Sequence, residues 1–314
     1  MTENPIIIAG RSNPALFKNI AAKADLELTK CDIVNFSDGE IFCQILENVR
    51  GGDVFILQST CTPVNENLME LLIIIDAVRR ASARRITAVM PYFGYARQDR
   101  KVQSRTPITA RLVCDLITRS GADRALFMDL HAGQIQGFFD KPVDHLYASP
   151  LMVDYLKKIN FKNLIVVSPD AGGVERARAF AKRLGSGLGI IDKRREEKNV
   201  AKAMHIIGDV KGRDALIVDD MIDTAGTLTE GANALMNAGA NSVRACCSHA
   251  VLSGKAIDRI NSSVITEVIS TNSINHSNRV SDCPKLKLLD IAPLFAAAIE
   301  RIHLEKSISN LFEY

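Results

Sequence analysis

Apolar runs rich in β-branched residues alternate along this chain with amphipathic segments of helical period. The runs expected to form strands are residues 6–9, 54–58, 86–90, 125–129, 164–168, 215–218, 243–249 and 264–270. Helical patterns lie between them, for example at residues 14–24, 66–81, 108–120, 174–184 and 228–238. This alternation predicts βαβ units, which build mainly parallel sheets flanked by helices. Functional loops are then expected at the carboxyl ends of the strands.

The chain is 314 residues long, which suggests about two domains. A weak internal repeat relates residues 52–57 to 213–218 and residues 83–89 to 240–246. The strand of the first half ends in Gln58-Ser59-Thr60, where the second half has Asp219-Asp220-Met221. We interpret this as a duplicated domain whose first copy lost an acidic pair, with chance similarity of short strands as the alternative. The predicted domains are residues 1–148 and 149–314.

Composition excludes several classes of protein. A net charge of +3 and the absence of Trp give no argument for nucleic-acid binding. The seven cysteines form no C-x-x-C and show no zinc spacing, so we expect free, mostly buried thiols in a reducing compartment. No signal peptide is evident, and the longest apolar stretch, residues 68–78, contains Glu70 and Asp76 and is too short to span a bilayer. A cytoplasmic protein without membrane or nucleic-acid partners is therefore expected.

Residues 219–227 combine acids with a turn that opens a helical pattern. Asp219 and Asp220 can accept hydrogen bonds from sugar hydroxyls or hold a hydrated metal, and they follow a predicted strand that ends at Val218. The Thr-Ala-Gly-Thr turn offers hydroxyls, backbone N–H groups and a helix N-terminus, which suit a phosphate. This segment can therefore grip a ribose 5-phosphate at both ends. A helix cap or a solvated turn is the structural alternative for the acid pair.

Other strings also carry chemistry. Residues 36–40 contain two acids around a glycine, with a plain hairpin turn as the alternative. Residues 91–101 combine aromatics with cations, which can stack a base and fork onto phosphate, or form a solvated basic loop. His131 follows a strand, and Asp170 stands before two glycines, where it can bind Mg²⁺. The cations of residues 193–195 can neutralise charge on a transferred phosphoryl group.

Together these strings resemble class I ribose-phosphate diphosphokinase, also called phosphoribosyl-diphosphate synthetase, over nearly the whole chain. The resemblance implies an α/β fold of two tandem type I phosphoribosyltransferase-like domains, each a mainly parallel sheet flanked by helices. It also implies a C-terminal helix that packs back on the first domain. The implied reaction transfers the diphosphoryl group of Mg·ATP to the 1-hydroxyl of ribose 5-phosphate, with AMP as the leaving group and Mg²⁺ as the cofactor.

The resemblance also implies residue roles. The residues expected to bind ribose 5-phosphate are Arg195, Asp219, Asp220, Asp223, Thr224, Ala225, Gly226 and Thr227. Those expected to bind ATP are Phe36, Asp38, Gly39, Glu40, Arg97 and Gln98. Lys193 and Arg195 would stabilise the transition state from a flap, and His131 and Asp170 would bind Mg²⁺. The family assembles as hexamers in which a neighbouring subunit completes the ATP site, with ADP and phosphate as effectors. The implied regulatory contacts are Asn48, Arg50, Ser307, Ser309 and Phe312, although Arg50 also fits a surface turn.

Two alternative functions share parts of this pattern. A phosphoribosyltransferase would use the same sugar loop without the other strings. A non-catalytic regulatory subunit would keep the fold but is typically recognised by insertions or lost catalytic residues. Three departures from the family pattern are a short loop at residues 102–106, Glu175 in place of an apolar residue, and an atypical segment at residues 270–275.

Overall fold

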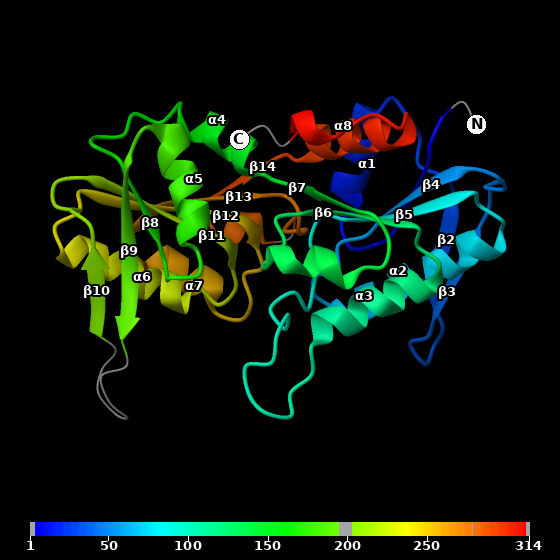
Figure 1. The fold of residues 1–314 in the computed structure, drawn as a ribbon, viewed down its shortest axis with the longest axis horizontal. Coiled ribbons are helices and arrows are strands. Elements are labelled where there is room, and N and C mark those ends of the chain that lie inside the picture. The colour runs from blue at the N-terminus through cyan, green and yellow to red at the C-terminus, as the bar shows by residue number, and fades with distance from the viewer. Residues whose placement is uncertain (1–3, 195–202, 278, 312–314) are drawn as a thin grey trace. The chain divides into compact units, whose positions relative to one another are not determined.

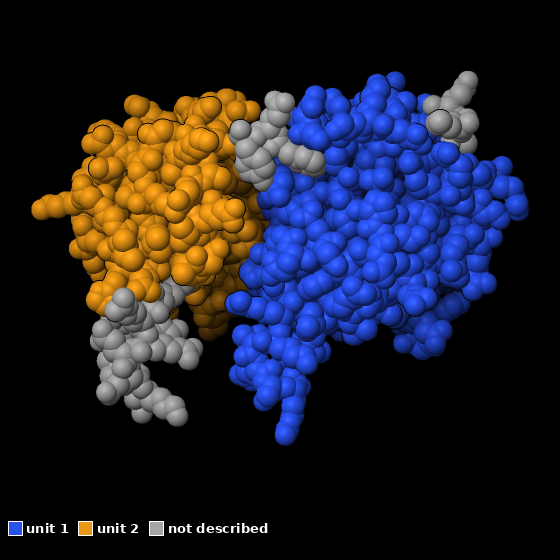
Figure 2. Space-filling view, viewed as in Figure 1, with its two compact units in different colours: residues 1–147, 273–275, 290–313 blue, residues 148–272, 276–289, 314 orange. Residues whose placement is uncertain are grey.

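The computed structural model describes residues 4–194, 203–277 and 279–311. These divide into two compact units, coloured separately in Figure 2. Among the described residues, unit 1 comprises 4–147, 273–275 and 290–311, and unit 2 comprises 148–272 and 276–289. The C-terminal helix therefore belongs to unit 1, so neither unit is one continuous stretch of the chain.

Unit 1 is built on a parallel sheet with the strand order β1-β4-β5-β6-β7. The strands are β1 (Ile6–Ala9), β4 (Asp53–Leu57), β5 (Arg85–Met90), β6 (Arg124–Met128) and β7 (Val143–Leu146). Its helices are α1 (Pro14–Lys23), α2 (Val64–Arg80), α3 (Thr109–Ser120) and α8 (Ala292–His303). Figure 1 shows α2 and α3 on one face of this sheet and α1 with α8 on the other. Because both faces are covered, β4 is buried along its whole length.

A separate antiparallel hairpin also belongs to unit 1. It pairs β2 (Cys31–Asn35) with β3 (Ile41–Ile45) and projects from the unit in Figure 1. Its burial alternates along both strands, so one face packs on the core of unit 1 and the other faces solvent. The sequence did not predict these strands, because such short, half-exposed strands carry a weak apolar signal.

Unit 2 contains a larger sheet with the strand order β10-β9-β8-β11-β12-β13-β14. The strands are β8 (Ile165–Ser168), β9 (Gly187–Arg194), β10 (Ala203–Ile207), β11 (Asp214–Ile222), β12 (Ser242–Ala250), β13 (Ile265–Thr271) and β14 (Leu286–Leu289). Its helices are α4 (Ser149–Leu156), α5 (Val174–Leu184), α6 (Gly226–Asn237) and α7 (Ala256–Ser262). Only the β9–β10 pair is antiparallel among the described strands of this sheet. Short 3-10 turns are η1 (Gly133–Phe138), η2 (Val280–Asp282) and η3 (Ser309–Leu311).

The two units repeat one topology. The order β1-β4-β5-β6-β7 in unit 1 matches β8-β11-β12-β13-β14 in unit 2, strand for strand in sequence order. An antiparallel hairpin follows the first strand in both units, β2–β3 in one and β9–β10 in the other. This correspondence supports the interpretation of a duplicated domain. The expected fold class, two mainly parallel sheets flanked by helices, is confirmed.

Each of the strands predicted from the sequence is present; most differ by one or two residues at the ends, and the strand predicted at residues 215–218 continues to Ile222. None of the described helices is long and apolar enough to cross a bilayer.

Candidate active site

The order in which strands are added to the sheet of unit 2 reverses between β8 and β11. From β8 the chain passes through α5 to β9 on one side, whereas β11 and its successors lie on the other side. At such a switch point the loops leave the sheet in opposite directions and open a crevice at the carboxyl ends of the strands. Asp170, just after β8, and the acids at the end of β11 flank this point.

The acid pair lies inside a strand. The sequence predicted that the strand ends at Val218, and this boundary is wrong, because β11 stays paired with β12 as far as Ile222 opposite Ala250. Pairing with β8, in contrast, ends at Ile217. The edge of β11 that carries Asp219 and Asp220 therefore extends past β8 into the switch-point crevice.

Arg176, on α5, holds the pair from one side. Its Nη1 lies 3.2 Å from Asp220 Oδ1 and 3.6 Å from Asp219 Oδ1. Asp219 Oδ1 also accepts a 2.9 Å hydrogen bond from the backbone N–H of Asp220. Burial and the adjacent charge of Asp220 nevertheless raise the pKa of Asp219 to about 7. This carboxyl is therefore half ionised near neutral pH and is poorly compensated by the protein itself.

The predicted phosphate turn follows directly. Helix α6 begins at Gly226, two residues earlier than the sequence predicted, so Gly226 and Thr227 form its first turn. Ala225 precedes it with a φ of +60°, a left-handed conformation that costs a non-glycine residue energy. Such strain is typical of functional loops. Arg259 Nη1 supports the turn from behind by donating a 2.7 Å hydrogen bond to the backbone oxygen of Thr224. The first N–H groups of a helix lack intrahelical partners, so this turn can bind an anion.

Asp170 lies in the loop between β8 and α5. Its side chain is exposed, and its Oδ1 accepts a 3.0 Å hydrogen bond from the N–H of Gly173, just before the helix. A Cβ on Gly173 would lie 2.9 Å from Ser168 Oγ, so the loop needs glycine there to turn this tightly. The side chain of Asp170 therefore helps to hold the turn that leads into α5. An exposed carboxylate can still serve as one oxygen ligand of Mg²⁺.

Of the two residues predicted to be catalytic, only Lys193 lies within the described part of the chain. Lys193 is part of β9, where its backbone pairs with Met204 of β10. Arg195 lies outside the described residues.

The residues predicted to bind ATP are all in unit 1, in two separate places. Residues 36–40 form the turn of the β2–β3 hairpin, where Phe36 N–H donates to Glu40 O at 2.8 Å and Gly39 has a φ of +96°. Asp38 Oδ1 accepts from the N–H of Glu40 at 3.0 Å. Arg97 and Gln98 are exposed in the loop after β5, which Figure 1 shows apart from the hairpin tip. Within a single subunit, the hairpin turn and the loop with Arg97 and Gln98 are therefore not adjacent.

His131 is exposed after β6 in unit 1, whereas Asp170 belongs to unit 2. Among the described residues there is no group of three or more His, Cys, Asp or Glu side chains that could hold a metal ion.

The predicted regulatory residues are also in unit 1. Asn48 Oδ1 accepts a 3.1 Å hydrogen bond from the N–H of Arg50, so these two form a turn between β3 and β4. Ser307 and Ser309 follow α8, with their hydroxyls 2.8 Å apart. Phe312 lies outside the described residues.

The corresponding switch point of unit 1, between β1 and β4, is filled by a buried polar network that the sequence did not predict. Glu70 of α2 accepts hydrogen bonds from Arg11 N and Nε, both at 2.6 Å, and from Gln58 Nε2 at 2.9 Å. A Cβ on Gly10 would lie 2.3 Å from Gln58 Oε1. Protein side chains therefore occupy this switch point, which fits a first copy that lost its acidic pair.

Comparison with known proteins agrees with this geometry. A family model described as the N-terminal domain of ribose phosphate pyrophosphokinase matches residues 5–121, and one described as the phosphoribosyl synthetase-associated domain matches residues 192–313. The ribose-phosphate pyrophosphokinase of Clostridium tetani is 56% identical over 98% of this chain and 97% of its own. The chain belongs to the ribose-phosphate pyrophosphokinase family.

Further relatives of this family agree over the full length. The ribose-phosphate pyrophosphokinase of Campylobacter jejuni is 53% identical over 98% of this chain and 98% of its own. The crystal structure of phosphoribosylpyrophosphate synthetase from Mycobacterium smegmatis superposes with a TM-score of 0.90 at 42% identity, covering 96% of this chain and 100% of that one. The likeness thus spans both units, as expected for a family of enzymes with this two-unit fold.

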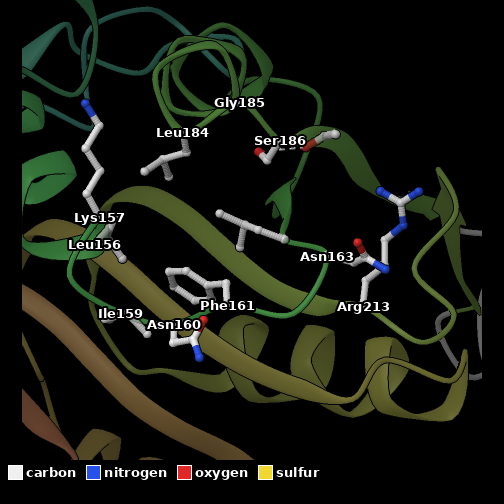
Figure 3. A pocket seen from close by; sticks show the side chains of 12 residues that line it. Leu156, Lys157, Ile159, Asn160, Phe161, Asn163, Leu184, Gly185, Ser186 and Arg213 are labelled. Atoms are coloured by element: carbon white, nitrogen blue, oxygen red, sulfur yellow. Dashed lines mark hydrogen bonds between the residues drawn. The ribbon is translucent and has the colours of Figure 1, made fainter.

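A cavity of about 460 Å³ in this pyrophosphokinase-family chain lies elsewhere in unit 2 (Figure 3). It is lined by the ends of α4 and α5 and by residues before β8, including Lys157, Phe161 and Ser186, with Arg213 before β11. These residues stand at the amino ends of the strands, whereas Asp170 and Asp219 stand at the carboxyl ends. The cavity is therefore distinct from the candidate active site.

Proposed function

We propose that this chain transfers the diphosphoryl group of Mg·ATP to the 1-hydroxyl of ribose 5-phosphate, giving 5-phosphoribosyl 1-diphosphate and AMP for nucleotide biosynthesis. Family membership and the switch-point site support this proposal. The acid pair lies near the end of β11, and the N-terminus of α6 follows at Gly226. Acceptors for sugar hydroxyls and donors for a phosphate therefore lie at the two ends of one short segment.

Asp219, Asp220 and the turn from Asp223 to Thr227 would orient the sugar. Hydroxyl groups of the ribose would donate to the carboxylates, and this donation would stabilise the ionised form of Asp219 against its burial. The 5-phosphate would sit against the N–H groups and hydroxyls at the start of α6. Fixing both ends leaves the 1-hydroxyl positioned for in-line attack on the β-phosphorus.

Lys193 and Arg195 would neutralise the charge that spreads over the transferred group and its neighbours. The pairing of β9 with β8 ends at Ile190, so Lys193 lies on the part of β9 that extends beyond β8. Mg²⁺ would supply further charge neutralisation on the ATP phosphates. Asp170 offers it one oxygen ligand, which fits an ion that keeps most of its ligands as waters and phosphate oxygens. His131 would contribute as a second contact.

The ATP-binding residues suggest an oligomer, in line with the hexamer expected from the resemblance. Because the hairpin turn and the Arg97–Gln98 loop lie apart within unit 1, a complete ATP site would take the hairpin of one subunit and the loop of another. Apolar side chains that a monomer leaves exposed favour subunit contacts at the hairpin and at α3, the helix that follows the loop. They are Val34, Phe36 and Phe42 on the hairpin and Ile108, Leu112 and Leu116 at α3. ADP and phosphate would act as effectors at Asn48, Arg50, Ser307, Ser309 and Phe312, in a cytoplasmic enzyme.

The decisive experiment measures AMP formed from Mg·ATP by the purified protein, with and without ribose 5-phosphate. The expected result is AMP release that requires the sugar, with an equal amount of phosphoribosyl diphosphate. Asp220→Asn should lose most of this activity, whereas Asp258→Asn, which changes an exposed acid on α7, should keep it. ATP cleavage to ADP, or AMP release independent of the sugar, would contradict the proposal.

The alternative functions give different results in the same assay. A non-catalytic regulatory subunit would form no AMP even as a folded oligomer supplied with phosphate, yet would alter the activity of a catalytic relative. A phosphoribosyltransferase would consume phosphoribosyl diphosphate and a nucleobase and release diphosphate.

A further inference from the structure

Two thiols face each other across the β2–β3 hairpin. Cys31 Sγ and Cys43 Sγ are 3.5 Å apart and share a hydrogen bond. In the register of the hairpin Cys31 lies opposite Ile45, and Ile33 lies opposite Cys43, so the two cysteines are diagonal neighbours on the same face. Their sulfurs lie within contact distance from different strands, so a small movement can bring them to bonding distance.

This pair differs from the other cysteines of the chain. Cys31 and Cys43 are half-buried, whereas the remaining cysteines are buried throughout the described part of the chain. Burial raises the pKa of Cys61 to about 11 and the pKa of Cys247 to about 12, so these thiols stay protonated and unreactive. With Cys31 as the donor of the shared hydrogen bond, the pKa of Cys43 is lowered and that of Cys31 is raised. Cys43 is thus the better nucleophile of the pair.

We propose that Cys31 and Cys43 are an oxidative modification site, at which hydrogen peroxide forms a reversible disulfide within the hairpin. Cys43 loses its proton to solvent, and the thiolate attacks peroxide to give a sulfenic acid and hydroxide, which takes up that proton as water. The Cys31 sulfur then attacks the Cys43 sulfur, and its own proton leaves with the sulfenic hydroxyl as a second water. The net reaction converts two thiols and one peroxide into one disulfide and two waters.

The disulfide alters the hairpin because the sulfurs must move closer. A disulfide bond is about 2.05 Å long and usually joins Cα atoms no more than about 6.8 Å apart. Diagonal partners in an antiparallel pair are about 7–8 Å apart, so the strands must shift to close the bond. The hairpin is not hydrogen-bonded into either large sheet, so its strands can shift without breaking the backbone hydrogen bonds of those sheets. Strain of this kind also makes a disulfide easy to reduce, so the modification is reversible.

The shift acts on the hairpin turn. Phe42, next to Cys43, packs edge-on against Phe36 with ring centroids 5.9 Å apart, so a change in strand twist repositions Phe36. If the turn binds ATP, which rests on the proposed function, oxidation raises the KM for ATP several-fold and leaves the KM for ribose 5-phosphate unchanged.

The test treats the full-length protein with hydrogen peroxide, blocks free thiols, and digests it with trypsin. Both cysteines fall in the single tryptic peptide 31–50, which contains no Lys or Arg before Arg50. The expected result is loss of two hydrogen masses from this peptide without thiol labelling, and full recovery with dithiothreitol. The disulfide is expected to fail in Cys31→Ser and in Cys43→Ser.

Cys31→Ser/Cys43→Ser is the matched control, since it keeps the remaining thiols and a hydrogen-bonding pair in the hairpin. ATP kinetics before and after peroxide should change in the wild type and not in this variant. Oxidation that stops at separate sulfinic acids, or a disulfide that involves another cysteine, would overturn the modification site. An intact disulfide with unchanged KM for ATP would overturn its effect on the turn. Mass spectrometry shows whether the disulfide forms even if the reduced protein forms no AMP. In that case the proposed function is contradicted and the modification site is not.

Discussion

Asp53 is expected to be the most sensitive acid for the stability of unit 1. It is fully buried at the start of β4 and accepts two hydrogen bonds from Arg85 of β5, from Nε at 2.7 Å and from Nη2 at 2.6 Å. It also accepts a 2.8 Å hydrogen bond from Nδ1 of His303, the last residue of α8. Arg85 further donates to the backbone oxygen of Ile302 at 3.0 Å. The carboxylate therefore joins two strands to a helix that lies 250 residues later in the chain.

Asp53→Ala should destabilise unit 1 by about 3–5 kcal/mol, the cost of removing one partner of a buried ion pair. Most of this cost arises because Arg85, whose side chain is 21% exposed, and His303, at 6%, cannot regain full hydration. For a unit of this size, a loss of that magnitude lowers Tm by roughly 6–20 °C. Asp76–Arg80 is the matched control, because its N–O distance is also 2.6 Å but it lies on the exposed surface of α2. Asp76→Ala should change stability little, since solvent screens that pair.

The two units need not unfold together, so the assay must resolve regions of the chain. Hydrogen exchange followed by mass spectrometry on peptides from β4, β5 and α8 measures the opening free energy of unit 1 directly. Peptides from β11 and β12 serve as an internal reference for unit 2. If Asp53→Ala and Asp76→Ala cost the same, burial does not set the strength of these ion pairs and the reasoning fails.

Three further predictions concern charged residues. Because the pKa of Asp219 is raised from 3.8 to about 7, the stability that its protonated form lends the folded state is lost as pH rises through that window. The Tm of Asp219→Asn should therefore exceed that of the wild type by an amount that grows with pH up to about pH 7 and stays constant at higher pH. A difference in Tm that does not depend on pH would contradict this. Lys193→Ala and Arg195→Ala should each lower kcat in steady-state assays, by an amount that corresponds to about 3 kcal/mol of activation free energy. A change in KM alone would rule out their proposed role. Glu70→Ala should lower the opening free energy of β1 and β4 by about 2–3 kcal/mol, near the lower limit for a buried pair because Arg11 can rehydrate. Unchanged exchange there would show that the network is not stabilising.

The central strands could be predicted from the sequence for a clear physical reason. A strand buried on both faces, such as β4 or β11, must be apolar almost continuously, and few other elements give short runs of that kind. Edge strands such as β7 and β14 are short and only partly buried, so nothing in their composition separates them from loops. The strands of the β2–β3 hairpin are also short and only partly buried. The sequence indicated only its turn, as one of two interpretations of residues 36–40.

At the candidate site, the local structure differs from the prediction made from the sequence. Two adjacent acids favour a strand end, because burying their charged side chains within a strand is unfavourable unless other residues compensate them. In the protein, β12 continues beside them to Ala250 and keeps the acids in register. The partner strand is remote in sequence, so the boundary could not be found locally. The position of α8 in unit 1 is equally nonlocal, because its partners, α1 and Asp53, lie near the other end of the chain.

The two equivalent switch points show how one duplicated architecture separates structure from function. In unit 1 the carboxylate of Glu70 accepts three short hydrogen bonds, so its charge is compensated within the protein. In unit 2 the carboxylate of Asp219 has one distant cation and one backbone donor, beside a second acid that raises its pKa. A satisfied buried charge stabilises a fold, whereas an undercompensated one is a cost that a ligand can remove. The difference in donors at the two sites, more than the presence of acids at either, is the reason why we propose the sugar site in unit 2 and not in unit 1.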